Sequence, residues 1–178
     1  MDKIQTIDQL VESLKSTEHK NFPKVLDQVE IPKSEFEEYA FWSEDRYTRN
    51  CIARTDRFEL MLLCWNSHQT TPIHCHGGQK CWVYQVDQSL TEVRFDYNED
   101  QELVQVEKHE VYPGDMAYMD DSMGFHSLRN KSEKKAMTLH LYMNPIDECR
   151  VYNDKLEKFE IKSLEYDTID GELLKISA

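Results

Sequence analysis

The segment TPIHCHGGQKC, residues 71–81, contains two histidines separated by a single residue, His74 and His76. Side chains two positions apart lie on the same face of a β-strand, so an extended segment would present both imidazoles side by side, as metal ligands. Cys75, between them, would point the other way. His126, in the segment DSMGFHSLRN, offers a third imidazole if its strand folds back beside the first pair. The pattern therefore permits a metal site with three histidine ligands.

On both sides of the first segment, the chain holds many short runs rich in β-branched and aromatic residues. Turn residues separate these runs, for example at Gly77-Gly78, Asn98-Glu99-Asp100 and Pro113-Gly114. Many short runs at fairly even spacing are typical of a double-sheet or barrel architecture. The predicted strands are RFELMLLCW (57–65), KCWVYQV (80–86), LTEVRFDY (90–97), ELVQVEKHEVY (102–112), DMAYM (115–119), AMTLHLYM (136–143) and KFEIK (158–162).

The first forty or so residues have helical periodicity instead. Thr6 and Gln9 form a capping-box pair, and Ser34 and Glu37 repeat it. The apolar residues at helical spacing beside these pairs are Ile7, Leu10, Val11 and Leu14, and then Phe36, Tyr39 and Ala40. A chain of 178 residues is too short for two ordinary domains and a linker. We therefore predict one domain over 1–178, helical over about 1–43 and a β-barrel over about 44–165.

Composition excludes several classes of protein. Hydrophobic residues make up 39% of the chain, with five Gly and five Pro, as in a folded globular protein. The formal net charge of -13 would repel a phosphate backbone, which makes nucleic acid and anionic membrane poor partners. No stretch approaches the roughly 18 apolar residues of a membrane span. The first residues lack the continuous apolar region of a secretion signal.

The five cysteines indicate a reducing compartment. Cys51, Cys64, Cys75, Cys81 and Cys149 are an odd number without disulfide-like or zinc-ribbon spacing. In a chain without an export signal, this usage favours reduced thiols. We expect a cytoplasmic protein, and a monomer.

A set of motifs in a fixed order makes the chain similar to a known superfamily. The HxH of His74 and His76 is followed by PGD at 113–115 and by HxxxN at 126–130, which resembles the paired motifs of the cupins. Cupins usually place a Glu four or five residues after the HxH, where this chain has Lys80 and Cys81. Cys81 in place of the carboxylate is typical of the cysteine dioxygenase family. Further stretches similar to that family are YTRN (47–50), LMLLCW (60–65), DSMGFH (121–126) and TLHLY (138–142).

The resemblance implies a mainly β fold, a cupin-type jelly-roll barrel with short N-terminal helices. It also implies Fe(2+) held on one face by His74, His76 and His126, with no organic cofactor. A catalytic metal site keeps the opposite face open, and three neutral imidazoles leave it the full charge of the metal, which favours an anionic thiolate. Arg49 matches the arginine that holds the substrate carboxylate, with Tyr47 in support.

The implied reaction joins both atoms of O2 to the sulfur of L-cysteine. The product, cysteine sulfinate, would enter the taurine or sulfate route of cysteine catabolism. Cys81 and Tyr142 match a pair that many family members join by a thioether cross-link. Thr138, His140 and Tyr142 share one strand face by their period of two, which favours a relay from hydroxyl to imidazole to phenol. The family more often has Ser at the position of Thr138.

Two further cysteines have no assigned role in the resemblance to the family. Cys75 stands where the family more often has an acidic or amide residue, and Cys149 aligns with a family cysteine to which the sequence assigns no function. The remaining histidines, His19, His68 and His109, match no motif, and we expect them on the surface.

Taken singly, several of these residues have a simpler interpretation. His140 would be a core histidine, Tyr142 a core aromatic and Arg49 a surface cation.

Among functions, a dioxygenase for 3-mercaptopropionate or cysteamine competes with a cysteine dioxygenase. Cysteamine has no carboxylate for Arg49, and the resemblance implies that mercaptopropionate enzymes lack Arg49 and Cys81. A non-catalytic metal-binding cupin would leave Thr138, His140 and Tyr142 unexplained. Three imidazoles alone suit zinc, nickel and iron alike.

Overall fold

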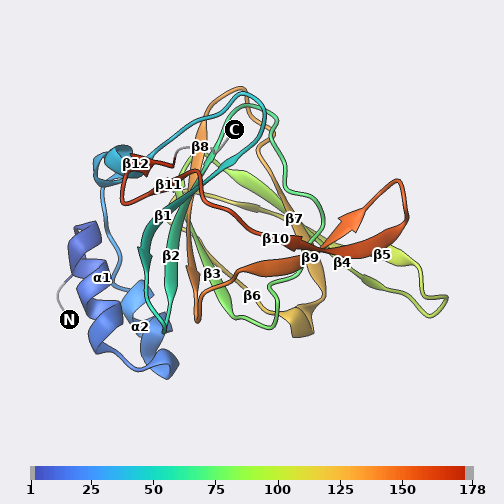
Figure 1. Ribbon diagram of the computed structural model, residues 1–178, viewed down its shortest axis with the longest axis horizontal. Helices are drawn as coiled ribbons and strands as arrows, with labels where there is room; N and C mark the ends of the chain where they lie inside the picture. The colour runs from blue at the N-terminus through green and yellow to red at the C-terminus, as the bar shows by residue number, and fades with distance from the viewer. Residues whose placement is uncertain (1–2, 175–178) are drawn as a thin grey trace.

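The protein was analysed as a computed structural model, which describes residues 3–174, so the outermost residues of the expected domain, 1–2 and 175–178, lie outside it. Short helices come first and strands follow, as the sequence predicts (Figure 1). The α-helices are α1 (Ile7–Ser16) and α2 (Phe22–Leu26), with 3-10 turns over His19–Asn21, Lys33–Tyr39 and Asp121–Met123. The strands are β1 (Thr48–Arg54), β2 (Glu59–Trp65), β3 (Cys81–Asp87), β4 (Leu90–Tyr97), β5 (Leu103–Val111), β6 (Met116–Met119), β7 (Phe125–Arg129), β8 (Ala136–Tyr142), β9 (Glu148–Asn153), β10 (Lys158–Ser163), β11 (Thr168–Ile169) and β12 (Glu172–Leu173).

The first predicted cap is correct and the second is wrong. The Thr6 hydroxyl accepts a hydrogen bond from the backbone N–H of Gln9 and so begins α1. The side chain of Gln9 returns to the backbone N–H of Gln5, one residue before the cap. The segment around Phe36 is a 3-10 helix that begins after Pro32 without a side-chain cap, so Ser34 is not a cap. Proline fixes an extended entry at this position and lacks a side-chain acceptor.

The main sheet has seven strands in the order β12-β11-β1-β2-β8-β3-β6. Every residue of β2 and of β8 is buried, which means that both faces of the sheet are covered at its centre. Alternate residues of these strands point to opposite faces of the sheet, so they belong to different cores. One face packs against the N-terminal helices through Leu60, Leu62, Cys64, Met137, Leu139 and Leu141. The other face turns inward, with Met61, Leu63, Trp65, Cys81, Val83 and Tyr142 in a second core.

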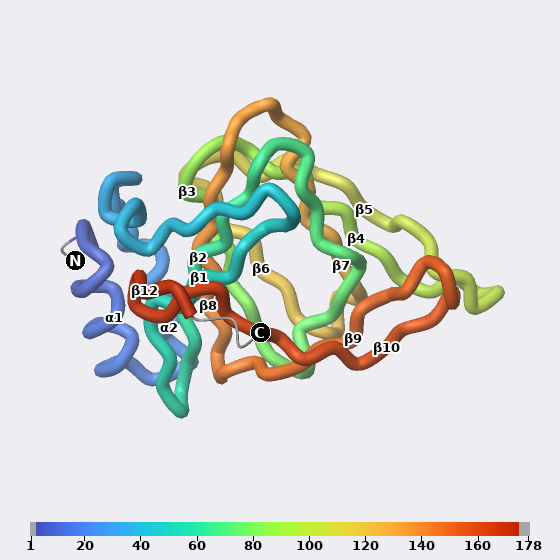
Figure 2. Tube along the Cα trace, turned by 45° about the horizontal axis from the view of Figure 1, so that its top comes forward, coloured from blue at the N-terminus to red at the C-terminus, as the bar shows by residue number. Residues whose placement is uncertain are grey.

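The inward face meets a second layer made of the sheet β5-β4-β7 and the hairpin β9-β10. Isolated bridges pair His74 with His126 and with Val151, so residues 71–78 run between β7 and β9. Figures 1 and 2 show the helices outside the main sheet, on the side away from this second layer. The arrangement is a jelly roll, in agreement with the predicted fold class.

The C-terminal segment returns to the start of the β region. β11 pairs in parallel with β1, and Asp167 accepts hydrogen bonds from the Arg49 backbone N–H and from the Arg46 guanidinium. β11 and β12 carry the β structure past residue 165. The seven predicted strands are all present, and β7 is the strand that the sequence analysis required for His126. The strands β1, β9, β11 and β12 were not among the predicted ones, and residues 71–78 are irregular rather than a strand.

All five cysteines are buried, free thiols. Within residues 3–174, no helix combines the length and the apolar character needed to cross a bilayer.

The packing of the helices on the sheet predicts a large loss of stability for Leu62→Ala. Leu62 is fully buried between β2 and the helices, and truncating such a leucine typically costs about 2–5 kcal/mol. Denaturant unfolding should show a lower midpoint with an unchanged slope. The control is Leu156→Ala, whose side chain is 54% exposed and which should change stability by less than about 0.5 kcal/mol. Equal effects of the two changes would contradict the described packing.

Candidate metal centre

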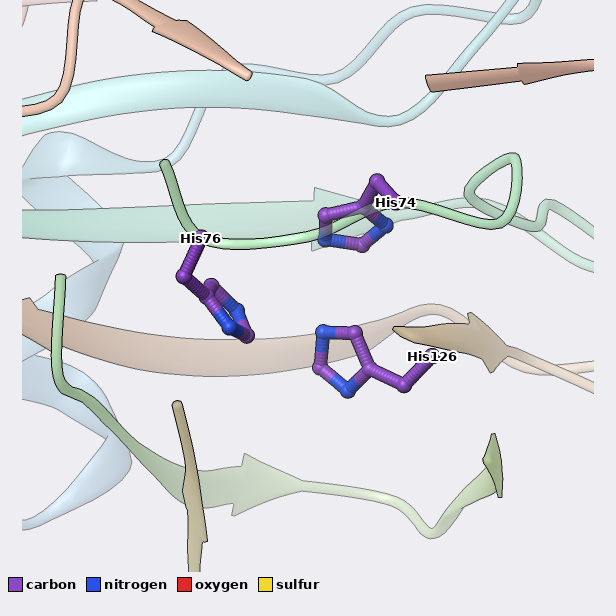
Figure 3. A group of neighbouring side chains, drawn as sticks. All are labelled: His74, His76 and His126. Carbon is purple, nitrogen blue, oxygen red and sulfur yellow. The ribbon is translucent and has the colours of Figure 1, made fainter. Parts of the chain in front are cut away.

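Three histidines form a cluster inside the barrel (Figure 3). One possible ligand atom from each of His74, His76 and His126 lies within 4.8 Å of the other two. The ring centroids are 4.6 Å apart for His74 and His126, 4.7 Å for His76 and His126, and 5.6 Å for His74 and His76. The structure thus brings together the three imidazoles that the sequence predicted as ligands, although His74 and His76 do not belong to a regular strand.

Backbone contacts fix the irregular segment that carries two of the ligands. His74 and His126 exchange two backbone hydrogen bonds of 3.0 Å each. The carboxylate of Asp121 accepts from the N–H groups of His76 and Gly78, at 2.8 Å in both cases. Gly77 has a φ of +58°, and a Cβ there would lie 2.8 Å from a backbone oxygen. The turn after His76 therefore requires glycine.

Burial favours the neutral form of His74 and His76. It lowers the pKa of His74 to about 3, with a further contribution from the neighbouring His126. Burial also holds the pKa of His76 well below its usual value, and the other imidazoles add to the effect. Neutral imidazole is the form that binds metals. His126 Nε2 and His76 Nδ1 are buried without a hydrogen-bond partner, which is costly unless another group satisfies them. The cluster fits a divalent transition metal on these grounds.

A buried carboxylate that the sequence analysis missed supports one of the ligands. Glu92 Oε1 accepts a hydrogen bond of 2.7 Å from His126 Nδ1. Burial alone would raise the pKa of Glu92, but the hydrogen bond from His126 and the charges nearby hold it below its usual value. An acidic residue between Thr91 and Val93 in a predicted strand was the available signal.

A cavity of about 700 Å³ opens beside the cluster. His74, Arg49, Tyr47, His140 and Tyr142 all line it, together with Cys75 and Cys149. Four of the six non-ligand residues chosen from the sequence for the reaction therefore face one space. The other two, Cys81 and Thr138, are fully buried and do not line it. The volume is in the range of small-molecule sites.

Arg49 is almost fully buried and held from the far end of the chain. Its Nε donates to the backbone oxygen of Glu165 at 3.2 Å. Its Nη2 is buried without a hydrogen bond and lies 3.8 Å from Glu59 Oε1. A buried guanidinium with unused donors on a cavity wall is suited to binding a carboxylate. The interpretation of Arg49 as a surface cation is therefore wrong.

Glu59 is a second buried acid that the sequence analysis missed. Its side chain is fully buried and accepts the Ile146 backbone N–H at 2.9 Å. It also lies 3.6 Å from Arg54 Nη1, so it is placed between two arginines. Glu59 pairs across the strands with Tyr142, which in turn pairs with Cys81. One row of the inward sheet face therefore holds an acid, a phenol and a thiol.

A hydrogen-bonded chain runs along the same face from Trp65 to His140. Trp65 Nε1 donates to Thr138 Oγ1 at 3.0 Å, and Thr138 Oγ1 lies 2.9 Å from His140 Nε2. Burial holds the pKa of His140 well below its usual value, which favours the neutral ring. Its Nδ1 faces Cys81 Sγ at 4.0 Å. Tyr47 stacks on Trp65 with ring centroids 4.8 Å apart.

The predicted relay is present in its first step only. Among the hydrogen bonds of the described residues there is none between His140 and the Tyr142 phenol, and their rings are stacked with centroids 6.4 Å apart. Burial raises the pKa of Tyr142 well above its usual value, so the phenol stays protonated. Burial also raises the pKa of Cys81, an effect that the Tyr142 side chain partly offsets.

The three histidines outside the motifs differ in environment. His68 is exposed and pairs with Glu133, as expected of a surface residue. His19 is partly buried and lies 2.8 Å from the Arg57 backbone oxygen. His109 was wrongly expected to be a plain surface residue, because its Nε2 lies 2.7 Å from Glu92 Oε2. No local pattern in the sequence indicates this contact, because it depends on the register between β4 and β5.

Known proteins with a similar sequence are enzymes of one kind. The family model of cysteine dioxygenase type I matches residues 1–155. Cysteine dioxygenase type 1 of Rattus norvegicus is 31% identical over 135 residues, which cover 74% of this chain and 68% of that protein. The protein of the same name from Danio rerio is 28% identical over 160 residues, covering 86% and 79%.

A solved structure supports the fold independently. An uncharacterised Klebsiella pneumoniae protein with a double-stranded β-helix domain aligns with a TM-score of 0.51, at 12% identity, over 72% of this chain and 94% of that one. This likeness concerns the fold alone, and it agrees with the predicted cupin jelly roll.

The cluster predicts that His126→Ala loses most of its bound metal. The change leaves two of the three candidate ligands, His74 and His76, which lie on one segment. His126 is the ligand that β7 contributes. Purified protein loaded with iron(II) under anaerobic conditions should then retain less than about a tenth of the metal of the unchanged protein. His68→Ala, which removes a histidine from the cavity wall but not from the cluster, should retain all of it. Full metal content in His126→Ala would contradict the assignment of the third ligand.

Proposed function

The chain belongs to the cysteine dioxygenase type I family, and on this basis we propose that it oxidises the thiol of L-cysteine to cysteine sulfinate. The iron(II) ion of the reaction is held by His74, His76 and His126. The observation that carries the proposal is that Arg49 and His74 line the same cavity. A small thiol with a carboxylate fits between a metal site and a cation arranged in this way.

The residues of the chain bind and orient the substrate. When bound, the iron supplies the redox chemistry that joins both atoms of O2 to sulfur. Imidazole ligands bring no negative charge to a metal, so the centre would keep a positive charge that favours the thiolate form of cysteine. Arg49 binds the substrate carboxylate through its guanidinium, whose buried Nη2 has no hydrogen bond to any described residue and lies 3.8 Å from Glu59 Oε1. Holding both ends of a small substrate fixes its sulfur in one position.

The phenol of Tyr142 lines the same cavity as Arg49, as a neutral hydrogen-bond donor. Tyr47 supports this region by stacking on Trp65, and Trp65 in turn bonds Thr138. The bond between Thr138 and His140 fixes the orientation of the His140 ring behind the cavity. These contacts support roles for Tyr142, Tyr47, Thr138 and His140 in positioning the reacting groups. Thr138 stands where the family more often has serine.

A thioether between Cys81 and Tyr142 is part of the proposal. The two residues are direct cross-strand partners on β3 and β8, with 0% and 4% of their surface exposed. Partners of this kind have Cβ atoms roughly 4.5–5.5 Å apart, within reach of a bond between Sγ and a ring carbon. Formation of the bond removes one hydrogen from the thiol and one from the ring, and O2 takes up the two electrons and two protons. The link would lock the phenol in one orientation.

Arg49 separates cysteine from cysteamine, which has no carboxylate for the guanidinium. 3-Mercaptopropionate has the carboxylate, but it lacks the amine with which cysteine would also bind the metal. A metal-binding cupin without redox activity would have no use for a buried thiol, phenol and imidazole on one sheet face. L-Cysteine uses both the cation and the metal site.

The proposal predicts that iron-loaded protein consumes O2 and forms sulfinate from L-cysteine, and that Arg49→Ala loses most of this activity. A charge-assisted bond to a buried carboxylate is worth about 2–3 kcal/mol, which corresponds to about 30- to 150-fold in kcat/KM. Turnover of cysteamine should change far less. An oxygen electrode and chromatography of the sulfinate measure both. Equal losses for the two thiols would show that Arg49 supports the fold or the metal instead, and no sulfinate from any of the three thiols would refute the proposed activity.

The thioether predicts a change in mass after turnover. Protein exposed to iron, cysteine and air should contain a fraction about two mass units lighter, which migrates faster on denaturing gels because the link closes a large loop. Cys81→Ser should lack this fraction and keep part of its activity, since the phenol can occupy the same place less rigidly. Cys64→Ser, on the opposite sheet face, is the control and should form the fraction normally. Tryptic peptides that always separate residues 81 and 142 in fully active protein would disprove the link.

A further inference from the structure

Glu92 lies at the centre of a polar group beside the metal site. Its surface is 1% exposed, and its two oxygens face different partners. Oε1 lies 2.7 Å from His126 Nδ1, and Oε2 lies 2.7 Å from His109 Nε2. Arg94 Nη2 is 3.4 Å from the same Oε2. A buried carboxylate thus joins a candidate ligand to a histidine at the edge of the barrel.

Strand register places all of these side chains on one face. In the pairing of β4 with β7, Arg94 is opposite His126. In the pairing of β4 with β5, Glu92 is opposite His109. Since Glu92 and Arg94 are two residues apart, they share a face with His126 and His109. A shift of one residue in either register would turn Glu92 away from the ring, so the contact is built into the sheet.

The hydrogen bond to Glu92 determines which nitrogen of His126 can bind a metal. A carboxylate accepts hydrogen bonds only, so Nδ1 of His126 carries the hydrogen. Nε2 is then the nitrogen whose lone pair can bind a metal. This atom is buried and has no hydrogen bond to any described residue. The orientation of a metal-binding histidine is commonly fixed in this way by the group bonded to its second nitrogen.

The three candidate ligands have unequal support. His74 Nδ1 lies 3.0 Å from the backbone oxygen of Pro72, a neutral acceptor. His76 Nδ1 has no hydrogen-bond partner. Only His126, of the three, is bonded to a charged group. An ordinary buried ion pair of Glu92 with Arg94 would not require this contact, and at 3.4 Å the arginine is the most distant of the three partners.

We propose that Glu92 is a positioning residue for the metal centre, which holds His126 with Nε2 toward the metal and supplies a negative charge one hydrogen bond away from it. His109 and Arg94 keep Glu92 in place from the outer side. The inference rests on the metal site of the proposed function. It assigns to a non-ligand residue the carboxylate charge that cupins usually provide by a glutamate ligand.

The test measures metal affinity separately from turnover. Iron(II) or cobalt(II) is titrated into metal-free protein against a colorimetric chelator under anaerobic conditions. Glu92→Gln keeps the size of the side chain and removes its charge, and it should weaken binding about 10- to 100-fold. The absorption spectrum of the cobalt form should shift as well, because the ligand field of His126 changes. Glu92→Asp, which restores the charge, should recover part of the affinity.

His109→Ala approaches Glu92 from the partly exposed side and should weaken binding several-fold even if Glu92→Gln fails to fold. Glu110→Gln is the matched control. Glu110 accepts a 2.6 Å hydrogen bond from Thr91 on the other face of the same hairpin, so its loss should leave metal affinity within about twofold.

Each outcome has a defined meaning. Unchanged affinity and spectrum in Glu92→Gln and His109→Ala would overturn the inference, as would equal losses in Glu110→Gln, which would indicate a general effect on the hairpin. If the unchanged protein binds metal but forms no sulfinate, the proposed function fails and the affinity ratios still decide the role of Glu92. If it binds no metal, both proposals fall.

Discussion

Two backbone hydrogen bonds between His74 and His126 are the constraint on which the site depends. They tie an irregular segment to β7 at the two histidines themselves, and the contacts of Thr71 with Leu128 and of His76 with Asp121 flank them. The same segment bridges to Val151 on β9, so the second layer of the jelly roll is closed through the residues that form the site. The closure of the fold and the geometry of the cluster therefore depend on the same contacts. Because backbone groups make the bonds, the side chains remain free for chemistry.

The inward face of the main sheet carries an unusual number of buried polar groups. Glu59, Arg49, His140 and Thr138 lie on it among Met61, Leu63 and Val83. Burying a charge is costly unless it is paired, and here Glu59 Oε1 faces Arg49 while Oε2 faces Arg54 and accepts the backbone N–H of Ile146. The opposite face of the same strands is apolar and packs against the helices. Stability and chemistry are thus divided between the two faces of one sheet.

The sequence predicted the fold class, the helical start, seven strands and the three clustered histidines. Period-two patterns and ordered motifs carry that information locally. It could not predict Glu92 or His109 as neighbours of the site, because their contact depends on the register of β4 against β5 and β7, which no local pattern encodes. Glu59 was hidden for another reason. In the run RFELMLLCW it has the sequence context of an exposed position at a strand end, and only the covering of both sheet faces buries it. The short strands β11 and β12 are two residues each, below what periodicity can detect.

The support of Arg49 by the C-terminal segment has a consequence for the order in which the protein matures. The guanidinium of Arg49 bonds the backbone oxygen of Glu165, 116 residues later, and its backbone N–H bonds Asp167. Residues of the histidine cluster, in contrast, are all present once the chain has been synthesised to position 126. The histidine cluster and the setting of Arg49 therefore depend on different parts of the chain. Contacts between residues as distant as Arg49 and Glu165 form late, after the loops that separate them have closed. The setting of Arg49 is complete only when β11 has docked on β1.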